Sequence, residues 1–267
     1  MKYGGGETLV QQGTVVAKIV DERGAPVADQ PVYLCGIDLC SAPGKTAANG
    51  AVTLQTNLMM KRPAFKYGDA LNYAELAIPL TSNSSDFTSG NRLLATGKLS
   101  DKPGAPLTPG QSATSGDVTL SIPNGATVGI DLLTYATLDQ QKLRTVNIPL
   151  TNLGPVFAGV MAGNAPANFA LVYGVAPAET ILCPAAKVTV ALPRKTAMMY
   201  NDLGWAPGSA VEFWVMTTDT GQTFAPYAGW AKMSDGVVSN DGASVTTLDG
   251  VNEGFIFLET FAIRKAN

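Results

Sequence analysis

Three cysteines and the absence of histidine limit the side-chain chemistry open to this chain. Without imidazole there is no Ser-His or Cys-His nucleophile pair, no histidine-ligated zinc and no imidazole base that titrates near neutral pH. Cys35 and Cys40 enclose a short loop, and a sharp turn at Gly36 would bring them to disulfide distance. Two reduced, unrelated thiols are the alternative. Cys183, which precedes Pro184, is expected to be a small buried apolar residue.

Carboxylate and lysine chemistry stays open. Paired carboxylates for glycoside hydrolysis must face each other about 5–10 Å apart, and no flanking motif supports such a pair. Asp235, Asn240 and Asp241 offer oxygen ligands for Ca²⁺, but the EF-hand spacing is absent and Asp-Gly pairs are common in turns. We therefore expect a non-enzymatic protein without a cofactor, with Ca²⁺ binding as the open alternative.

Three aromatic residues are the candidates for ligand binding. Trp205 lies in the predicted loop 201–208, and Tyr227 and Trp230 flank a short segment at the start of a predicted strand. Exposed aromatic side chains can stack on sugar rings or anchor a protein partner. The alternative for each is packing over the end of a β-sandwich, and Trp214, which alternates with Phe213, is expected in a core.

The composition favours an all-β protein. Of 267 residues, 46% are hydrophobic and 15% are charged, with 28 Gly and 17 Pro. Such low charge and frequent turn residues suit many short strands. The net charge of −3 and the absence of a Lys/Arg run argue against nucleic-acid binding. No stretch approaches the ~20 apolar residues of a membrane span.

The chain divides in two at a Pro/Gly-rich segment. Residues 1–12 are predicted to be a flexible leader without the apolar region of a signal peptide. The expected β-sandwiches cover 13–99 and 112–267, joined by a semi-extended linker at 100–111. The predicted strands are 14–20, 30–35, 51–56, 128–135, 143–150, 155–161, 169–175, 186–192, 209–217 and 254–264, with a helical turn at 195–203.

Turn motifs resemble two known kinds of module. The segments DERGAPV (21–27) and TAANGAV (46–52) resemble the transthyretin-like carboxypeptidase regulatory module and the invasin-type bacterial Ig-like module. In the second half, GDVTLSIPNGAT (116–127) resembles the strand and Pro-x-Gly-Ala corner of ZU5-like β-sandwich domains. Further resemblance to that family lies in 186–193, 208–214 and 230–236.

This resemblance implies an exported surface protein of Gram-negative bacteria. Some relatives of the ZU5-like fold cleave themselves with the help of a histidine, an activity that does not carry over to a chain without histidine. If the protein is exported, Met1 replaces a leader that has been removed, and the native N-terminus could carry a lipid anchor. Export would also place the protein in an oxidising extracellular or periplasmic location, which favours a Cys35–Cys40 disulfide.

The resulting hypothesis is a non-enzymatic surface protein that acts in adhesion or protein–protein interaction. Recognition of a partner protein or a cell-surface glycan is expected in loops such as 81–92 and 201–208, because loops carry function on rigid scaffolds. Three alternatives stay open. One is a carbohydrate-binding module, which needs exposed aromatic residues on one face. Another is a structural subunit of a surface or extracellular assembly, which needs an apolar interface. The third is a hydrolase built on carboxylates, which needs a cleft where carboxylates converge.

Overall fold

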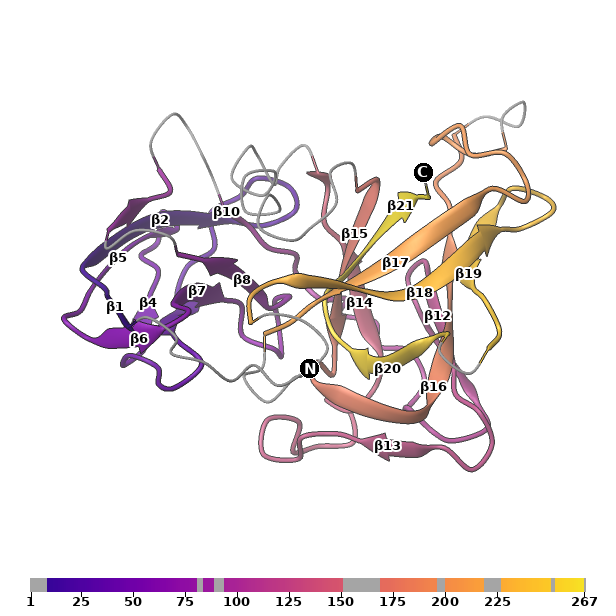
Figure 1. Cartoon of the computed structure of the whole chain (residues 1–267), viewed down its shortest axis with the longest axis horizontal. Helices are drawn as coiled ribbons and strands as arrows, with labels where there is room; N and C mark the ends of the chain where they lie inside the picture. The colour runs from indigo at the N-terminus through magenta and orange to yellow at the C-terminus, as the bar shows by residue number, and fades with distance from the viewer. Residues whose placement is uncertain are drawn as a thin grey trace.

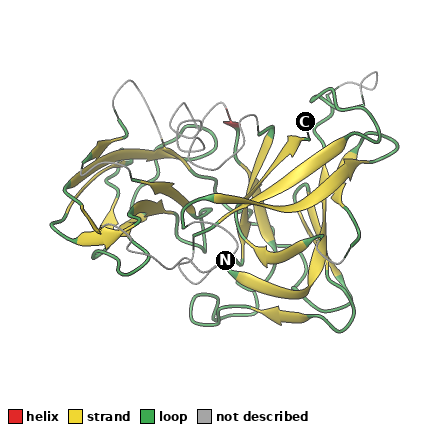
Figure 2. Ribbon diagram, in the orientation of Figure 1, coloured by secondary structure: helices red, strands yellow, loops and turns green. Residues whose placement is uncertain are grey.

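The computed structural model describes residues 9–80, 84–88, 94–150, 169–195, 200–218, 227–250 and 253–266. The described chain is all-β, as the composition predicts, and Figure 2 shows strands joined by turns and loops. Within these residues no helix has the length and apolar character needed to cross a membrane.

The first half of the chain (residues 9–99) builds two four-stranded sheets that share a core, together with a separate two-stranded sheet. One sheet has the order β10-β2-β5, with β9 also paired to β2, and the other has the order β4-β3-β7-β8, while β1 pairs with β6. These strands form the indigo and purple side of Figure 1. Their bounds are β1 (Leu9–Gln11), β2 (Thr14–Val20), β3 (Pro31–Cys35), β4 (Gly44–Lys45), β5 (Ala51–Gln55), β6 (Met59–Lys61), β7 (Ala64–Tyr67), β8 (Leu76–Pro79), β9 (Ser85–Asp86) and β10 (Leu94–Ala95).

Alternation with period two explains how these sheets face each other. In β2, the side chains of Val15, Ala17 and Ile19 are fully buried, and their neighbours along the strand point the other way. They join Phe65 and Tyr67 of β7 in one hydrophobic cluster. The strands predicted at 14–20, 30–35 and 51–56 agree with β2, β3 and β5 to within one residue.

The second half (residues 112–266) builds one long sheet around its own core. The order is β11-β12-β16-β19-β18-β17-β21-β15-β14, and β13 and β20 pair with β16 outside this path. The rings of Phe213, Phe255 and Phe261 contact one another at the centre of this core. The bounds are β11 (Ser112–Ser115), β12 (Val118–Ser121), β13 (Thr127–Gly129), β14 (Arg144–Asn147), β15 (Leu171–Ala176), β16 (Thr180–Ala191), β17 (Ala210–Met216), β18 (Trp230–Val238), β19 (Ser244–Thr247), β20 (Phe255–Leu258) and β21 (Phe261–Lys265).

Two of the predicted strands are interrupted in the structure. The strand predicted at 128–135 ends at Gly129, because the chain turns at Asp131, which accepts hydrogen bonds from the amides of Leu133 and Tyr135. The strand predicted at 254–264 is two strands, β20 and β21, separated by a bend at Glu259 and Thr260. The strand predicted at 155–161 lies outside the described residues, as do residues 196–199 of the helical turn predicted at 195–203, whose described residues 200–203 are not helical.

The two halves pack directly against each other. The amide of Ala77 in β8 donates to Met216 Sδ at 3.3 Å, and Thr260 Oγ1 donates to the carbonyl oxygen of Glu75 at 2.8 Å. The first-half cluster also includes Val172 and Trp230 from the second half. The second half therefore covers β8 on the side that faces away from the first-half core. This explains why β8 is apolar on both faces, as is typical of a strand buried on both sides.

The segment 100–111 lies against the second half instead of bridging open solvent. The amide of Gly104 donates to Leu143 O at 2.7 Å, the amide of Gly110 donates to Ile122 O at 3.0 Å, and Leu107 is buried. These contacts hold the segment in place on one side. The domain boundary predicted there stays a prediction.

The disulfide between Cys35 and Cys40 is confirmed. Their Cα atoms are 4.0 Å apart, and the amide of Gly36 donates to Leu39 O at 2.7 Å, which closes the tight turn between them. The prediction for Cys183 is wrong, because this residue is an exposed free thiol. It follows buried Leu182 in β16, and the alternation of the strand places its side chain on the outward face with exposed Ile181.

Candidate functional site

The three aromatic residues predicted to bind a ligand are all buried. Their exposed fractions are 6% for Trp205, 8% for Tyr227 and 4% for Trp230. Trp205 packs into the second-half core, where Asn201 holds its loop by bonding both the amide and the carbonyl of Trp205. Tyr227 and Trp230 pack into the core shared by the two halves. They do not form the exposed aromatic face that a sugar-binding site requires.

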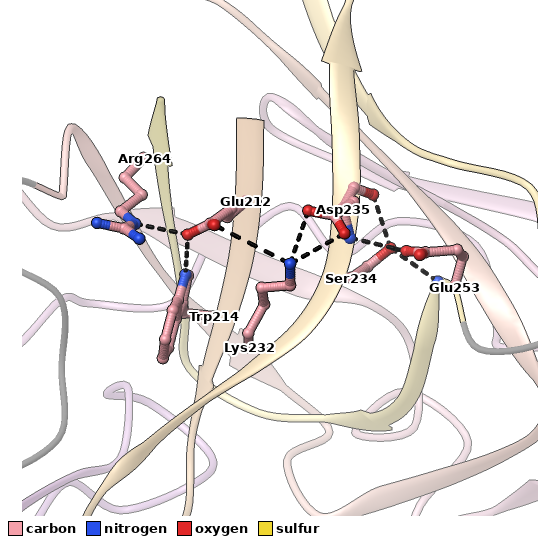
Figure 3. A network of polar contacts seen from close by, with 8 residues as sticks. Glu212, Trp214, Lys232, Ser234, Asp235, Glu253 and Arg264 are labelled. Atoms are coloured by element: carbon pink, nitrogen blue, oxygen red, sulfur yellow. Dashed lines mark hydrogen bonds and ion pairs between the residues drawn. The ribbon is translucent and has the colours of Figure 1, made fainter. Parts of the chain in front are cut away.

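A chain of polar contacts covers part of the outward face of β17, β18 and β21. Its members are Glu212, Trp214, Lys232, Ser234, Asp235, Glu253 and Arg264, here called the outer-face network (Figure 3). Glu212 Oε2 accepts hydrogen bonds from Arg264 Nε at 2.6 Å and Trp214 Nε1 at 3.0 Å. Burial acts to raise the pKa of Glu212, but the hydrogen bonds from Arg264 and Trp214 lower it below its ordinary value.

The outer-face network continues across β18, where its charged side chains pair with one another. Lys232 Nζ lies 2.8 Å from Asp235 Oδ1, and the Asp235 amide donates to Glu253 Oε2 at 2.7 Å. The Arg264 guanidinium lies over the indole of Trp214, 5.6 Å from the ring centroid, and the ring of Phe169 also contacts this indole. Because its hydrogen-bonding groups and its ring already have partners, this network is suited to hold three strands together, and it offers little to a ligand.

A second polar group lies at the junction of the two halves. Lys66 in β7 lies 3.4 Å from Glu75 Oε2 and 3.6 Å from Glu179 Oε1. Glu179 comes from the turn between β15 and β16, so its ion pair with Lys66 joins the halves, whereas Glu75 belongs to the first half like Lys66. Glu259, at the bend between β20 and β21, is fully buried, and its Oε1 accepts from Thr218 Oγ1 at 2.7 Å. Lys66, Glu75, Glu179 and Glu259 are called the junction cluster.

The pKa values of both Glu259 and Lys66 are raised in the junction cluster, which favours the neutral form of the carboxyl group and the charged form of the amine. Burial raises the pKa of Glu259 well above its ordinary 4.5, and the nearby carboxylates of Glu179 and Glu75 raise it further. Burial acts to lower the pKa of Lys66, but Glu75, Glu179 and Glu259 outweigh burial and raise it above the ordinary 10.5. The cluster therefore combines a firmly charged ammonium with a carboxyl group that resists ionisation.

A small cavity of about 110 Å³ adjoins the junction cluster. Its lining includes Lys66, Glu75, Asp131, Tyr135 and Glu179. This volume is below the roughly 300–1,000 Å³ of pockets that hold small-molecule ligands. Carboxylates do converge here, as the hydrolase alternative requires, but both that face Lys66 are engaged in ion pairs, so the geometry suits an internal charge cluster better than a sugar site.

Tyr135, which lines the cavity, belongs to a loop that exposes several leucine side chains to solvent. The Tyr135 hydroxyl accepts from the Ala178 amide at 2.8 Å and donates to Ala70 O at 3.3 Å. Residues 130–142 around it, called the leucine loop, expose Leu132 by 63%, Leu133 by 96% and Leu138 by 80%. These are the three most exposed large hydrophobic side chains among the residues that the structure describes.

Hydrogen bonds within the leucine loop fix its shape. The Leu133 amide donates to Asp131 Oδ1 at 2.9 Å, and Gln141 Nε2 donates to Tyr135 O at 2.9 Å. The side chain of Thr134 and the amide of Leu133 lower the pKa of Asp131, which keeps this carboxylate charged in its turn. The exposed leucines are thus presented by a braced loop.

The residues proposed as Ca²⁺ ligands serve other roles. Asp235 is paired with Lys232, and Asp241 Oδ1 accepts from Ser239 Oγ and from the Ala243 amide, which makes an ordinary turn. In the part of the chain that the structure describes, no group of three or more His, Cys, Asp or Glu side chains is placed to hold a metal ion.

Sequence reasoning did not find the junction cluster, although two signals were present. Lys66 lies between Phe65 and Tyr67 in β7, and Glu259 interrupts an apolar run at 254–264. The predicted recognition loop 201–208 is packed and hydrogen-bonded, and the other, 81–92, lies largely outside the described residues. No protein-family model, curated protein or solved structure matches this chain.

Proposed function

We propose that this chain is a non-enzymatic exported surface protein that acts in adhesion or protein–protein interaction through a loop on a rigid β-sandwich body. The observation that carries the proposal is the leucine loop, which holds Leu132, Leu133 and Leu138 in solvent on a braced backbone. Large apolar side chains held in solvent on one loop are suited to an interaction site, because water is released when a partner covers them.

Export is supported by the disulfide and by the sequence resemblance. Disulfides persist in oxidising compartments and are rare where thiols are kept reduced. The Cys35–Cys40 bond therefore suggests an extracellular or periplasmic location. The resemblance to transthyretin-like, Ig-like and ZU5-like modules of exported proteins belongs to the same proposal, together with a lipid anchor at the native N-terminus.

Thiol counting on protein isolated from its source cells tests the location. We expect one reactive thiol, that of Cys183, when the protein is alkylated under native conditions without reductant. Cys35 and Cys40 should react only after reduction, which peptide mapping by mass spectrometry would show. Alkylation of all three cysteines in unreduced protein would argue for a reducing compartment and against export.

Binding to intact cells tests the adhesive role of the leucine loop. In a variant with Leu132→Ser, Leu133→Ser and Leu138→Ser, we expect binding of the fluorescently labelled protein to drop by about tenfold or more, since 1.4 kcal/mol of lost apolar contact already gives that factor. Stability should change little because these side chains are exposed in the free protein.

The matched control changes three leucines elsewhere on the surface. Leu39, Leu58 and Leu248 are also exposed, and replacing each with serine removes the same number of apolar side chains. The proposal requires this control to bind cells as the wild type does. Equal loss in both triple variants, or no loss in either, would show that the leucine loop is not the contact site.

The same loop also supports the structural-subunit alternative. Exposed leucines can meet the leucines of a second copy, and self-association would then appear in light scattering as a mass that rises with protein concentration and falls in the leucine-loop variant. A monomer at all concentrations that still binds cells favours adhesion. The carbohydrate-binding alternative gains no support from the buried Trp205, Tyr227 and Trp230.

A further inference from the structure

We propose that Glu259 holds a proton in the folded protein at neutral pH, and that this proton makes the junction between the two halves responsive to pH. The geometry of the junction cluster carries this inference. Glu259 is fully buried, and among the described residues only Thr218 Oγ1 is shown bonding to its carboxyl group. Its Oε2 is buried and has no hydrogen-bond partner among the residues that the structure describes.

An ionised Glu259 would be poorly accommodated at this position. A carboxylate can accept hydrogen bonds at both oxygens, and a charged oxygen buried without a donor costs far more than a neutral hydroxyl in the same place. The proton therefore belongs on Oε2, since Oε1 is occupied by the hydroxyl of Thr218. The fully buried state of the side chain keeps solvent from supplying the missing donors.

The surrounding charges act in the same direction. Lys66 is the cation of the junction cluster, and its ammonium is already shared between Glu75 and Glu179. Titratable groups that interact with this cluster also include Tyr227 and Tyr135, neither of which supplies positive charge. A third carboxylate would repel Glu75 and Glu179, and that repulsion would weaken the Lys66–Glu179 ion pair that joins the two halves.

The pH dependence follows from linkage. Because the pKa of Glu259 is raised in the folded protein above its ordinary 4.5, its contribution to stability is complete below that value and is lost as pH rises toward the raised pKa. Lys66 stays charged over this window, since its own pKa is raised above 10.5. The junction is thus stronger in mild acid and weaker in mild alkali.

The absence of histidine simplifies the measurement of how unfolding depends on pH. No imidazole titrates between mild acid and mild alkali, so one buried carboxyl group can dominate the proton balance of unfolding there. For the wild type we expect the equilibrium constant for unfolding in urea to rise by up to about tenfold per pH unit above pH 5, which is the slope for one released proton. In Glu259→Gln, a neutral isostere, this slope should be lost.

Two further measurements keep the proposal falsifiable if the variant folds poorly. Infrared spectra of the wild type at neutral pH should contain the C=O stretching band of a protonated carboxyl group, and this band should disappear at alkaline pH and be absent in Glu259→Gln. Hydrogen exchange at alkaline pH should be faster in the wild type than in Glu259→Gln for peptides covering β7, β8, β20 and β21. Peptides covering β11 and β12, which contribute nothing to the junction cluster, should exchange equally.

Glu22→Gln serves as the control, because Glu22 lies in a surface turn of the first half where its Oε2 accepts from the Lys98 amide. This variant should keep the wild-type slope and the infrared band. The proposal is overturned if the wild type lacks the carboxyl band at neutral pH, or if wild type and Glu259→Gln show the same dependence of unfolding on pH.

Discussion

Gly174→Ala is expected to destabilise the protein by about 3 kcal/mol or more, at the upper end of the range for overpacking a filled core. Gly174 lies in β15, where a Cβ atom would overlap the Cβ of Ala74 and come within 3.2 Å of Val146 Cγ1. Ala74 is fully buried in the first half, so the added methyl group pushes against the packing between the halves. Urea unfolding followed by tryptophan fluorescence measures the effect.

A second substitution shows whether the loss of stability comes from the clash with Ala74 or from any substitution in β15. Ala74→Gly removes the atom that the new Cβ would meet, so the double variant should recover much of the loss, giving a favourable coupling energy in a double-mutant cycle. Gly129→Ala is the control, because a Cβ there would meet Ile181 Cβ at an ordinary 3.6 Å. Additive losses at positions 74 and 174 would contradict the contact.

Local patterns explain which parts of the fold follow from the sequence. Alternation in 14–20 predicts β2 because the inward side chains Val15, Ala17 and Ile19 are apolar and their neighbours are less so. The turn at Gly36 follows from the spacing of Cys35 and Cys40. In these segments, short-range chemistry and the final environment agree, so the sequence alone is sufficient.

Long-range packing explains the rest. The outward face of β7 carries Lys66, which local alternation assigns to solvent, and only the docking of the second half surrounds it with Glu179 and Glu259. Trp205 lies in a loop, as predicted, yet Asn201 folds that loop inward. Leu132 and Leu133 lie in the strand predicted at 128–135, whereas Asp131 turns the chain and leaves them exposed.

Lys66→Met should cost about 3 kcal/mol at neutral pH, the lower end of the range for breaking a buried ion pair, because Glu179 is one-third exposed and water screens part of its charge. Methionine keeps the length and apolar stem of the lysine but leaves Glu75 and Glu179 without their cation. The loss should shrink in acid, where protonation of these carboxyl groups removes the repulsion. Chemical denaturation at neutral and acidic pH would measure both effects.

The matched control is Lys187→Met, which removes an ion pair with Asp249 on the surface. Exposed pairs contribute about 0–1 kcal/mol, so this variant should stay close to the wild type at both pH values. If Lys66→Met were equally mild, the charges of the junction cluster would contribute little, and the two halves would owe their contact to apolar packing and to hydrogen bonds such as that from Thr260 to Glu75 O. A large loss that acid relieves would instead assign the cluster a direct part in joining them, since only a charge imbalance responds to protons in that way.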